Sequence, residues 1–440
     1  MVGYLTSLSI FIATYALFSL GLNLQWGFTG LINFGHVAFL TLGAYVTVLL
    51  TLNGVPIFLA TLAGGLCAAL LGLLIGLSTL RLREDYLAIV TIGVAEVVRL
   101  IALNEEWLTK GTRGVYGYPL PLDKLDPNLA VKVGMIGVLT GIFGLGLWHL
   151  WRWVSQLLTG DRPSPGVRSA PAVRLLSRSR SILAFSGYGL CLVLLAVTLW
   201  LGFSVDFGFL FASIVPLALG AGMPYLQLKQ PLVQLRQQPS STPLAIAAAT
   251  FTFGVAMMAY WANVIGLWDY TYKAGLMWLL VVSVALVFWR LQALVNSPWG
   301  RVLKAIREDE DVAKALGKNV FRYKLQSLMI GGAIAGLAGS FYAWQLTFIN
   351  PDGFISLLTF QAWIIVVLGG SGNNVGTLLG ALIFWAYDAA TRFLLPAVLQ
   401  LDDARLGAFR VMVIGLLMIV LMMWRPQGIL GKKDELSLGR

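Results

Sequence analysis

The sequence predicts an all-α, polytopic integral membrane protein. Three observations support this fold class: 58% of the 440 residues are apolar, only 12% are charged, and the mean hydropathy is +0.80. No soluble fold buries that much apolar surface, whereas a helix that spans a bilayer needs about 20 mostly apolar residues. The composition therefore excludes a secreted disulfide scaffold, a nucleic-acid-binding protein and a cytosolic enzyme.

Apolar runs separated by polar breaks predict about 10–13 transmembrane helices. Several runs are short or interrupted by glycine, which is typical of split or re-entrant segments. In chain order, the candidate spans lie near residues 5–24, 31–52, 58–80, 86–103, 129–150, 182–201, 207–222, 244–265, 276–294, 325–346, 354–368, 375–395 and 411–424.

The distribution of positive charge predicts the orientation of these spans. If the C-terminus is cytoplasmic, 22 of the 31 Lys and Arg residues lie on the cytoplasmic side and 8 on the opposite side. This bias is the one that the positive-inside rule describes. The first cation is Arg81, so the N-terminus lacks the basic region of a signal peptide. We therefore expect a multi-pass protein with its N-terminus outside and its C-terminus in the cytoplasm.

Composition divides the chain into three sections. An N-terminal transmembrane half covers residues 1–128, an inserted section with extra spans covers 129–243, and a C-terminal transmembrane half covers 244–440. Within the insertion, residues 160–181 hold Pro, Ser and five arginines with little helical periodicity. That composition predicts a flexible cytoplasmic linker.

Enzymatic signatures are absent from the sequence. It holds no G-x-x-x-x-G-K-[ST] phosphate loop, no H-E-x-x-H and no C-x-x-C. We therefore expect no catalytic residue, no metal site and no nucleotide hydrolysis in this chain. If the protein moves a solute, the energy comes from an ion gradient or from a separate ATPase subunit.

The longest charged loop, residues 297–324, lies on the predicted cytoplasmic side. Apolar residues fall on roughly one helical face of this loop and charged residues on the other. Asp309 falls on the apolar face, so we expect the helix to break into two short pieces there, and Gly317 suits a left-handed C-cap. Such a helix either inserts into a groove of a partner protein or is a solvated link between two spans. The apolar set is Val302, Ala305, Ile306, Ala313 and Leu316, and the charged set is Arg307, Glu308, Asp311 and Lys314.

Glycine and polar residues inside predicted spans are candidates for a substrate path. Asn33, Gly35 and His36 interrupt one apolar span. His36 either titrates in a gating step or, as we favour, hydrogen-bonds to a neighbouring helix. Gly369 and Gly370 begin a polar break, which is either unwound backbone along the path or, as we favour, a tight turn.

Charged pairs on two predicted spans are further candidates. Glu96 and Arg99 lie three residues apart, and Asp388 and Arg392 lie four apart, so each pair shares one helix face. An ion pair inside a membrane marks a functional site by default, although side chains that extend to the interface explain such pairs equally well.

The charged loop resembles a sequence found in a family of transport proteins. Asp311 to Gly317 (DVAKALG) is similar to the E-A-A-x-x-x-G loop of ABC importer permeases, with Asp311 and Val312 in place of the usual Glu and first Ala. The longer stretch SPWGRVLKAIREDEDVAKALG resembles the matching loop of LivM-type permeases for branched-chain and other neutral amino acids. Five other segments resemble that family in the same order: residues 30–45, 80–100, 109–119, 335–344 and 366–381.

The resemblance implies a permease subunit that imports neutral or branched-chain amino acids across a bacterial inner membrane. The loop would then be the coupling helix seated on the ATPase. Implied partners are a LivH-like permease subunit, two ABC ATPase subunits that bind the ATP, a periplasmic amino-acid-binding protein and the lipid bilayer, with no cofactor in this chain and no nucleic acid. The implied coupling residues are Ala305, Ile306, Glu308, Asp311, Val312, Ala313, Leu316 and Gly317.

Two alternatives remain open from the sequence. Permeases for urea or short amides share this loop pattern, and spans with few charges suit any uncharged or zwitterionic solute. An ion-coupled secondary transporter would instead use Glu96, Asp388 and His36 as coupling groups. The section from about residue 129 to 243 has no counterpart in the family pattern, so the resemblance implies no role for it.

Overall fold

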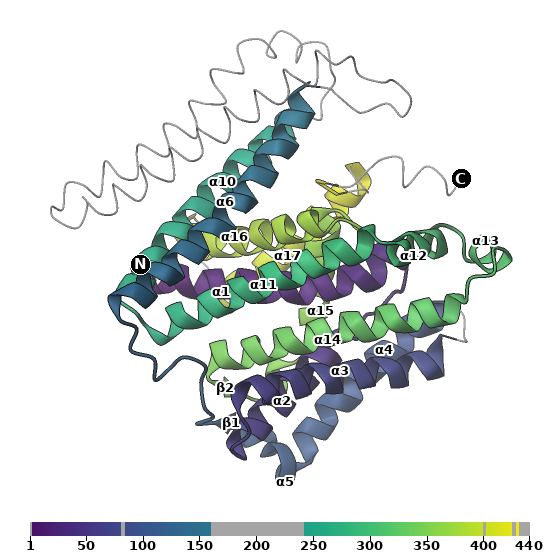
Figure 1. The fold of residues 1–440 in the computed structure, drawn as a ribbon, viewed down its shortest axis with the longest axis horizontal. Helices are drawn as coiled ribbons and strands as arrows, with labels where there is room; N and C mark the ends of the chain where they lie inside the picture. The colour runs from purple at the N-terminus through teal and green to yellow at the C-terminus, as the bar shows by residue number, and fades with distance from the viewer. Residues whose placement is uncertain (1, 81–83, 160–241, 399–401, 425–427, 431–440) are drawn as a thin grey trace. The chain divides into compact units, whose positions relative to one another are not determined.

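The computed structural model describes residues 2–80, 84–159, 242–398, 402–424 and 428–430. These residues are almost entirely helical, and their one sheet has two strands of two residues each (Figure 1). The prediction of an all-α membrane protein is confirmed.

The helices and strands follow the apolar runs of the sequence. Long helices coincide with the apolar runs because a helix satisfies its own backbone hydrogen bonds, as a segment in lipid must. The described elements are α1 (Val2–Leu22), the π-helix η1 (Asn23–Phe28), α2 (Val37–Leu52), α3 (Ile57–Thr79), α4 (Glu84–Asn104), α5 (Glu106–Thr109), η2 (Gly111–Arg113), β1 (Val115–Tyr116), α6 (Leu129–Thr159), α10 (Thr242–Trp268), α11 (Tyr272–Asn296), α12 (Pro298–Glu308), α13 (Glu310–Ala315), α14 (Val320–Leu346), β2 (Phe348–Ile349), η3 (Pro351–Gly353), α15 (Leu357–Gly369), α16 (Asn374–Val398) and α17 (Asp403–Trp424).

Within the described residues, seven helices are long and apolar enough to cross a membrane, and two shorter apolar helices accompany them. The shorter two are α2 and residues 254–268 of α10. The predicted spans at 182–201 and 207–222, together with the predicted linker at 160–181, lie outside the described residues. The three-section organisation of the chain therefore stays a prediction.

The chain forms two compact units, residues 1–145 with 251–440, and residues 146–250. All sites described below belong to the first unit. In the second unit, the described residues are the end of α6 and the start of α10.

Three helices pack through small residues at the centre of the first unit. α14 lies against both α2 and α3 (Figure 1). A Cβ added to Gly336 of α14 would lie 2.6 Å from the Cβ of Ala68 and 3.1 Å from the carbonyl oxygen of Gly64, both on α3. In a bilayer, lipid tails are as apolar as the side chains, so the hydrophobic effect does not bring helices together. Helices associate there through close packing of small residues such as these.

The segment between α4 and α6 is folded, although it is rich in charged residues and glycine. It contains α5, η2 and β1, and β1 pairs antiparallel with β2 in the register Val115 to Ile349 and Tyr116 to Phe348. The hydroxyl of Tyr118 donates to the carbonyl oxygen of Ala343 near the end of α14. These long-range contacts order the segment, and local composition does not reveal them.

The predicted span at 31–52 is wrong at its start. Residues 30–36 are not helical, and α2 begins at Val37. The preceding helix α1 continues into the π-helix η1, whose wider turns are uncommon and often occur at functional sites. A break thus separates η1 from α2 within the first unit.

Candidate functional site

The break at residues 29–36 is held by buried polar side chains. The Asn33 side chain donates from Nδ2 to Oε1 of Gln25 at 2.9 Å and accepts from the Gly35 backbone N–H at 2.9 Å. Gln25 in turn donates to the carbonyl oxygen of Leu328 on α14 at 3.1 Å. Asn33 and Gln25 are both fully buried. Irregular backbone at membrane depth requires such internal partners, because lipid supplies none.

Neighbouring helices complete the support of this break. The Val37 N–H, the first of α2, donates to Oγ1 of Thr359 on α15 at 2.9 Å. Trp363 of α15 donates from Nε1 to the carbonyl oxygen of Asn33 at 3.0 Å. Gly35 lies so close to Thr91 of α4 that an added Cβ would overlap the Thr91 carbonyl oxygen. Only glycine therefore fits at position 35 without a movement of α4.

His36 hydrogen-bonds to a neighbouring helix, as we favoured. Its Nε2 lies 3.1 Å from the Phe18 carbonyl oxygen of α1, and its ring stacks on the Phe18 ring with centroids 4.7 Å apart. The side chain is completely buried. This geometry places His36 as a structural link between α1 and the start of α2.

The polar break at Gly369 and Gly370 is a tight turn, also as we favoured. α15 ends at Gly369, Gly370 has a φ of 110°, and α16 begins at Asn374. The turn contacts η1, because the Gly372 N–H donates to Oδ1 of Asn23 and Asn23 Nδ2 donates to Oδ1 of Asn374, each at 3.0 Å.

The charged pair Glu96 and Arg99 forms as predicted, but away from this polar centre. Arg99 contacts Glu96 at 2.6 Å, and its other Nη lies 3.5 Å from Oδ1 of Asp352 on η3. Arg99 thus joins α4 to the segment after β2. Asp388 and Arg392 pair separately on α16, at 2.8 Å. The candidate path residues therefore form three groups, with Asn33, Gly35 and His36 in the break, Gly369 and Gly370 in the α15–α16 turn, and Glu96 with Arg99 elsewhere on α4.

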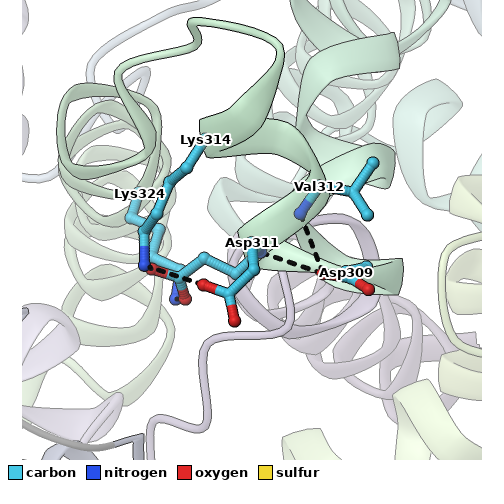
Figure 2. Close-up of polar contacts among 6 residues, drawn as sticks. Asp309, Asp311, Val312, Lys314 and Lys324 are labelled. Carbon is cyan, nitrogen blue, oxygen red and sulfur yellow. Dashed lines mark hydrogen bonds and ion pairs between the residues drawn. The ribbon is translucent and has the colours of Figure 1, made fainter.

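The charged loop at residues 297–324 breaks at Asp309, as the sequence predicts. α12 ends at Glu308, Asp309 is extended, and α13 begins at Glu310. The Asp309 carboxylate accepts hydrogen bonds from the backbone N–H groups of Asp311 and Val312 at 2.9 and 3.0 Å (Figure 2). An aspartate that caps the N-terminus of the second helix explains why a charge falls on the apolar face. Gly317 ends the loop helix with a φ of 74°, the left-handed C-cap that was predicted.

The predicted apolar face is divided between two surfaces, which corrects its assignment as one partner-binding face. Ile306 and Ala313 pack inside the chain against Val320 of α14. They are therefore not free to contact a partner. Leu316 is 71% exposed and Val312 is 54% exposed, so these two form the apolar surface that is available at the tip of the loop. Of the other implied coupling residues, Ala305 is half-buried, and Glu308, Asp311 and Gly317 are exposed.

Ion pairs attach α13 to the start of α14. Glu310 accepts from Lys314 at 3.0 Å and from Lys324, which is nearly buried. Partial burial on its own would raise the pKa of the Glu310 carboxyl. The hydrogen bonds and positive charges of Lys324 and Lys314 outweigh burial and hold that pKa below its ordinary value. Glu310 is therefore ionised at neutral pH and holds the two lysines together.

Three contributors to this site were not predicted. Asn23 and Gln25 interrupt the first apolar span, and this polar pair in an apolar run was the available signal. Arg307 was assigned to solvent because it is charged. Instead, its guanidinium donates to the backbone carbonyl of Gly27 in η1. A backbone acceptor carries no side-chain signature, so no sequence signal could have revealed this contact.

Comparison with known proteins identifies relatives of the chain. The family described as branched-chain amino acid transport system, permease component, matches residues 4–205 and 179–422. The high-affinity branched-chain amino acid transport system permease protein LivM of Escherichia coli (strain K12) is 26% identical over 417 residues, which cover 94% of this chain and 67% of the relative.

Other relatives match shorter stretches. The probable branched-chain amino acid transport permease protein LivM of Methanocaldococcus jannaschii is 30% identical over 167 residues, covering 36% of this chain and 47% of the relative. The autoinducer 2 import system permease protein LsrC of Salmonella paratyphi B is 28% identical over 238 residues, covering 49% and 64%. No solved structure matches the chain.

Proposed function

The chain belongs to the family of branched-chain amino acid transport system permease components, and from this membership we propose that it translocates neutral or branched-chain amino acids across the inner membrane. It is a permease subunit of an ATP-binding cassette importer and not an enzyme. ATP is bound and hydrolysed by separate subunits, and this chain carries no cofactor of its own.

The observation that carries the proposal is the structure of the α12–α13 loop. One side of the loop is fixed to α14 by Ile306 and Ala313, and the tip leaves Val312 and Leu316 exposed. A short helix that packs on α14 with one side and exposes two apolar side chains on the other suits insertion into a groove of a partner protein. In an importer permease, the matching partner is the ATPase.

The partners and orientation follow from the same proposal. As a permease of this family, the chain works with ATPase subunits and a substrate-binding protein in the bacterial inner membrane. We assign two ATPases, a LivH-like second permease and a periplasmic amino-acid-binding protein. The N-terminus lies outside and the C-terminus in the cytoplasm, which puts residues 297–324 on the side of the ATPases.

The break between η1 and α2 is the proposed substrate path. Asn33, Gly35 and His36 lie within it, and Gly369 and Gly370 form the turn that contacts η1 through Gly372. Unwound backbone with buried amides is the usual way in which a transporter brings polar groups to the membrane interior. Glu96 and Arg99 lie outside this break, so we assign them to a separate part of the path, where Arg99 connects α4 to η3.

No contact among the described residues favours an ion-coupled carrier. Such a carrier needs an acidic group that can gain and lose an ion, but Glu96 and Asp388 each pair with an arginine on their own helix. Uptake assays with urea, short amides and amino acids distinguish a urea or amide permease from an amino acid permease.

The substitution Leu316→Asp tests the coupling assignment. Because Leu316 is 71% exposed, the change leaves the folding of the permease intact but puts a charge into the proposed ATPase groove. We expect a normally inserted protein that no longer retains its ATPase and no longer imports amino acids. Lys318→Gln, at an exposed neighbouring position, is the matched control and should behave like the parent.

Co-purification of the ATPase and uptake in proteoliposomes are the measurements. A Leu316→Asp protein that retains the ATPase and sustains substrate-stimulated hydrolysis at the parental rate would show that the loop is not the coupling element.

A further inference from the structure

One side chain of the coupling loop contacts the transmembrane interior directly. Arg307, in the last turn of α12, donates a hydrogen bond to the backbone carbonyl of Gly27, which lies in the π-helix η1. The two residues are 280 positions apart in the chain. The last carbonyls of a helix lack partners within it, and the arginine satisfies one of them.

Arg307 lies close against two glycines. A Cβ added to Gly372, in the α15–α16 turn, would lie 2.8 Å from an Arg307 Nη and 2.8 Å from the Gly27 oxygen. A Cβ added to Gly30 would lie 3.6 Å from Cγ of Arg307. The guanidinium therefore lies where the end of η1 and the α15–α16 turn come together, and both contribute glycine at the point of contact.

A second contact joins the same helix to η1. The Nζ of Lys304 lies 5.7 Å from the centroid of the Phe28 ring, a cation–π distance. Lys304 precedes Arg307 by three residues, so both side chains leave the same face of α12. α12 is thus fixed to two successive residues of η1.

Hydrogen bonds continue this connection to the helix that precedes the loop. Gln292 of α11 accepts from Asn374 Nδ2 at 3.2 Å, and Asn374 accepts from Asn23 of η1 at 3.0 Å. Asn23 also accepts from the Gly372 N–H. Hydrogen bonds therefore join η1 to α12, to the α15–α16 turn and, through Asn374, to α11, and the chain itself closes the ring between α11 and α12.

From this ring we propose that Arg307 is the positioning residue that transmits movement of the coupling loop to η1 and, through η1, to the break at residues 29–36. The inference rests on the proposed function, because it requires an ATPase to move the loop. A hydrogen bond from a charged donor is strong, so a displacement of α12 pulls on the Gly27 backbone carbonyl, whereas an apolar contact would let α12 slide past η1. Without Arg307, the loop still binds the ATPase but no longer moves the path.

The test is the ratio of amino acid transported to ATP hydrolysed, measured on the complete importer in proteoliposomes. Arg307→Gln should retain the ATPase and hydrolyse ATP, but the transport ratio should fall at least about fivefold. Arg307→Lys keeps the charge and a hydrogen-bond donor group but loses the planar guanidinium, so its ratio should lie between those of Arg307→Gln and the parent. Arg301→Gln, an exposed position on the same helix, is the matched control and should keep the parental ratio.

Hydrogen exchange on the parental complex provides a second measurement that does not depend on the folding of a variant. Addition of a non-hydrolysed ATP analogue should change exchange in residues 23–30 as well as in the loop. A change confined to the loop, or an Arg307→Gln protein with the parental transport ratio, would overturn the assignment of Arg307 while leaving the proposed function intact. Failure of the parental chain to retain any ATPase would instead overturn the proposed function.

Discussion

Replacement of Gly336 by alanine tests the close packing of α14 on α3. The added Cβ would lie 2.6 Å from the Cβ of Ala68 and 3.1 Å from the carbonyl oxygen of Gly64. Carbon atoms in contact are ordinarily about 3.5–4.0 Å apart, so α3 and α14 must separate by roughly 1 Å. Both obstructing groups belong to a helix and cannot turn aside as the end of a flexible side chain could.

The expected cost follows from two opposing effects. Overpacking costs about 1–3 kcal/mol, and a contact this short lies at the upper end of that range. Alanine is favoured over glycine in a helix by about 1 kcal/mol, which offsets part of the loss. The net destabilisation of Gly336→Ala is therefore about 2 kcal/mol, a substantial fraction of the stability of a typical domain.

Thermal unfolding of the purified protein in detergent measures the effect. Gly93→Ala on α4 is the matched control, because nothing lies within 4 Å of its added Cβ, and it should unfold at the parental temperature or above. The double variant Gly336→Ala with Ala68→Gly removes the clashing methyl group and should recover much of the loss. If Gly336→Ala unfolds at the parental temperature, α14 and α3 do not pack as described.

Two further substitutions test the loop and the break. Glu310→Gln should weaken the attachment of α13 by about 1 kcal/mol, which should appear as faster protease cleavage within residues 309–319. Asp311→Asn is the control, because the Asp311 side chain is 93% exposed, and this variant should be cleaved at the parental rate. Equal cleavage rates for the two variants and the parent would refute the role of the Glu310 ion pairs. Thr359→Ala leaves the buried N–H of Val37 without its acceptor and should lower stability by about 1–3 kcal/mol. Thr359→Ser keeps the hydroxyl, so thermal unfolding of the serine variant should lie closer to the parent than that of the alanine variant, and the reverse order would contradict the contact.

The break of the loop at residues 297–324 was predictable from a single residue. Asp309 falls on an apolar face, which predicted a break there, and the structure adds that Asp309 is the N-cap of α13. The division of the apolar residues was not predictable in the same way. The assignment of residues to one helical face requires one continuous helix. The bend at Asp309 instead turns α13 so that Ala313 packs against Val320 while Leu316 stays exposed.

The interior of the site was less predictable than the loop. Hydropathy assigns residues 31–52 to one predicted span even though Asn33 and His36 lie within it, because the remaining residues are mostly apolar. The chain unwinds there because Gln25, Thr359 and other distant groups replace the hydrogen bonds that a helix would make. Family membership came from segments that resemble LivM-type permeases in the same order, rather than from any hydropathy pattern.

The contacts between α6 and α10 have a consequence for how the chain tolerates change in length. Lys132 donates to the carbonyl oxygen of Trp268, and the hydroxyls of Thr140 and Tyr260 lie 2.8 Å apart. The two points where the chain leaves and re-enters the first unit are therefore fixed side by side. The entropic cost of closing a flexible loop between fixed ends grows only with the logarithm of its length, by about 0.6 kcal/mol for each doubling. A change in the length of the chain between these two ends therefore costs the first unit little stability.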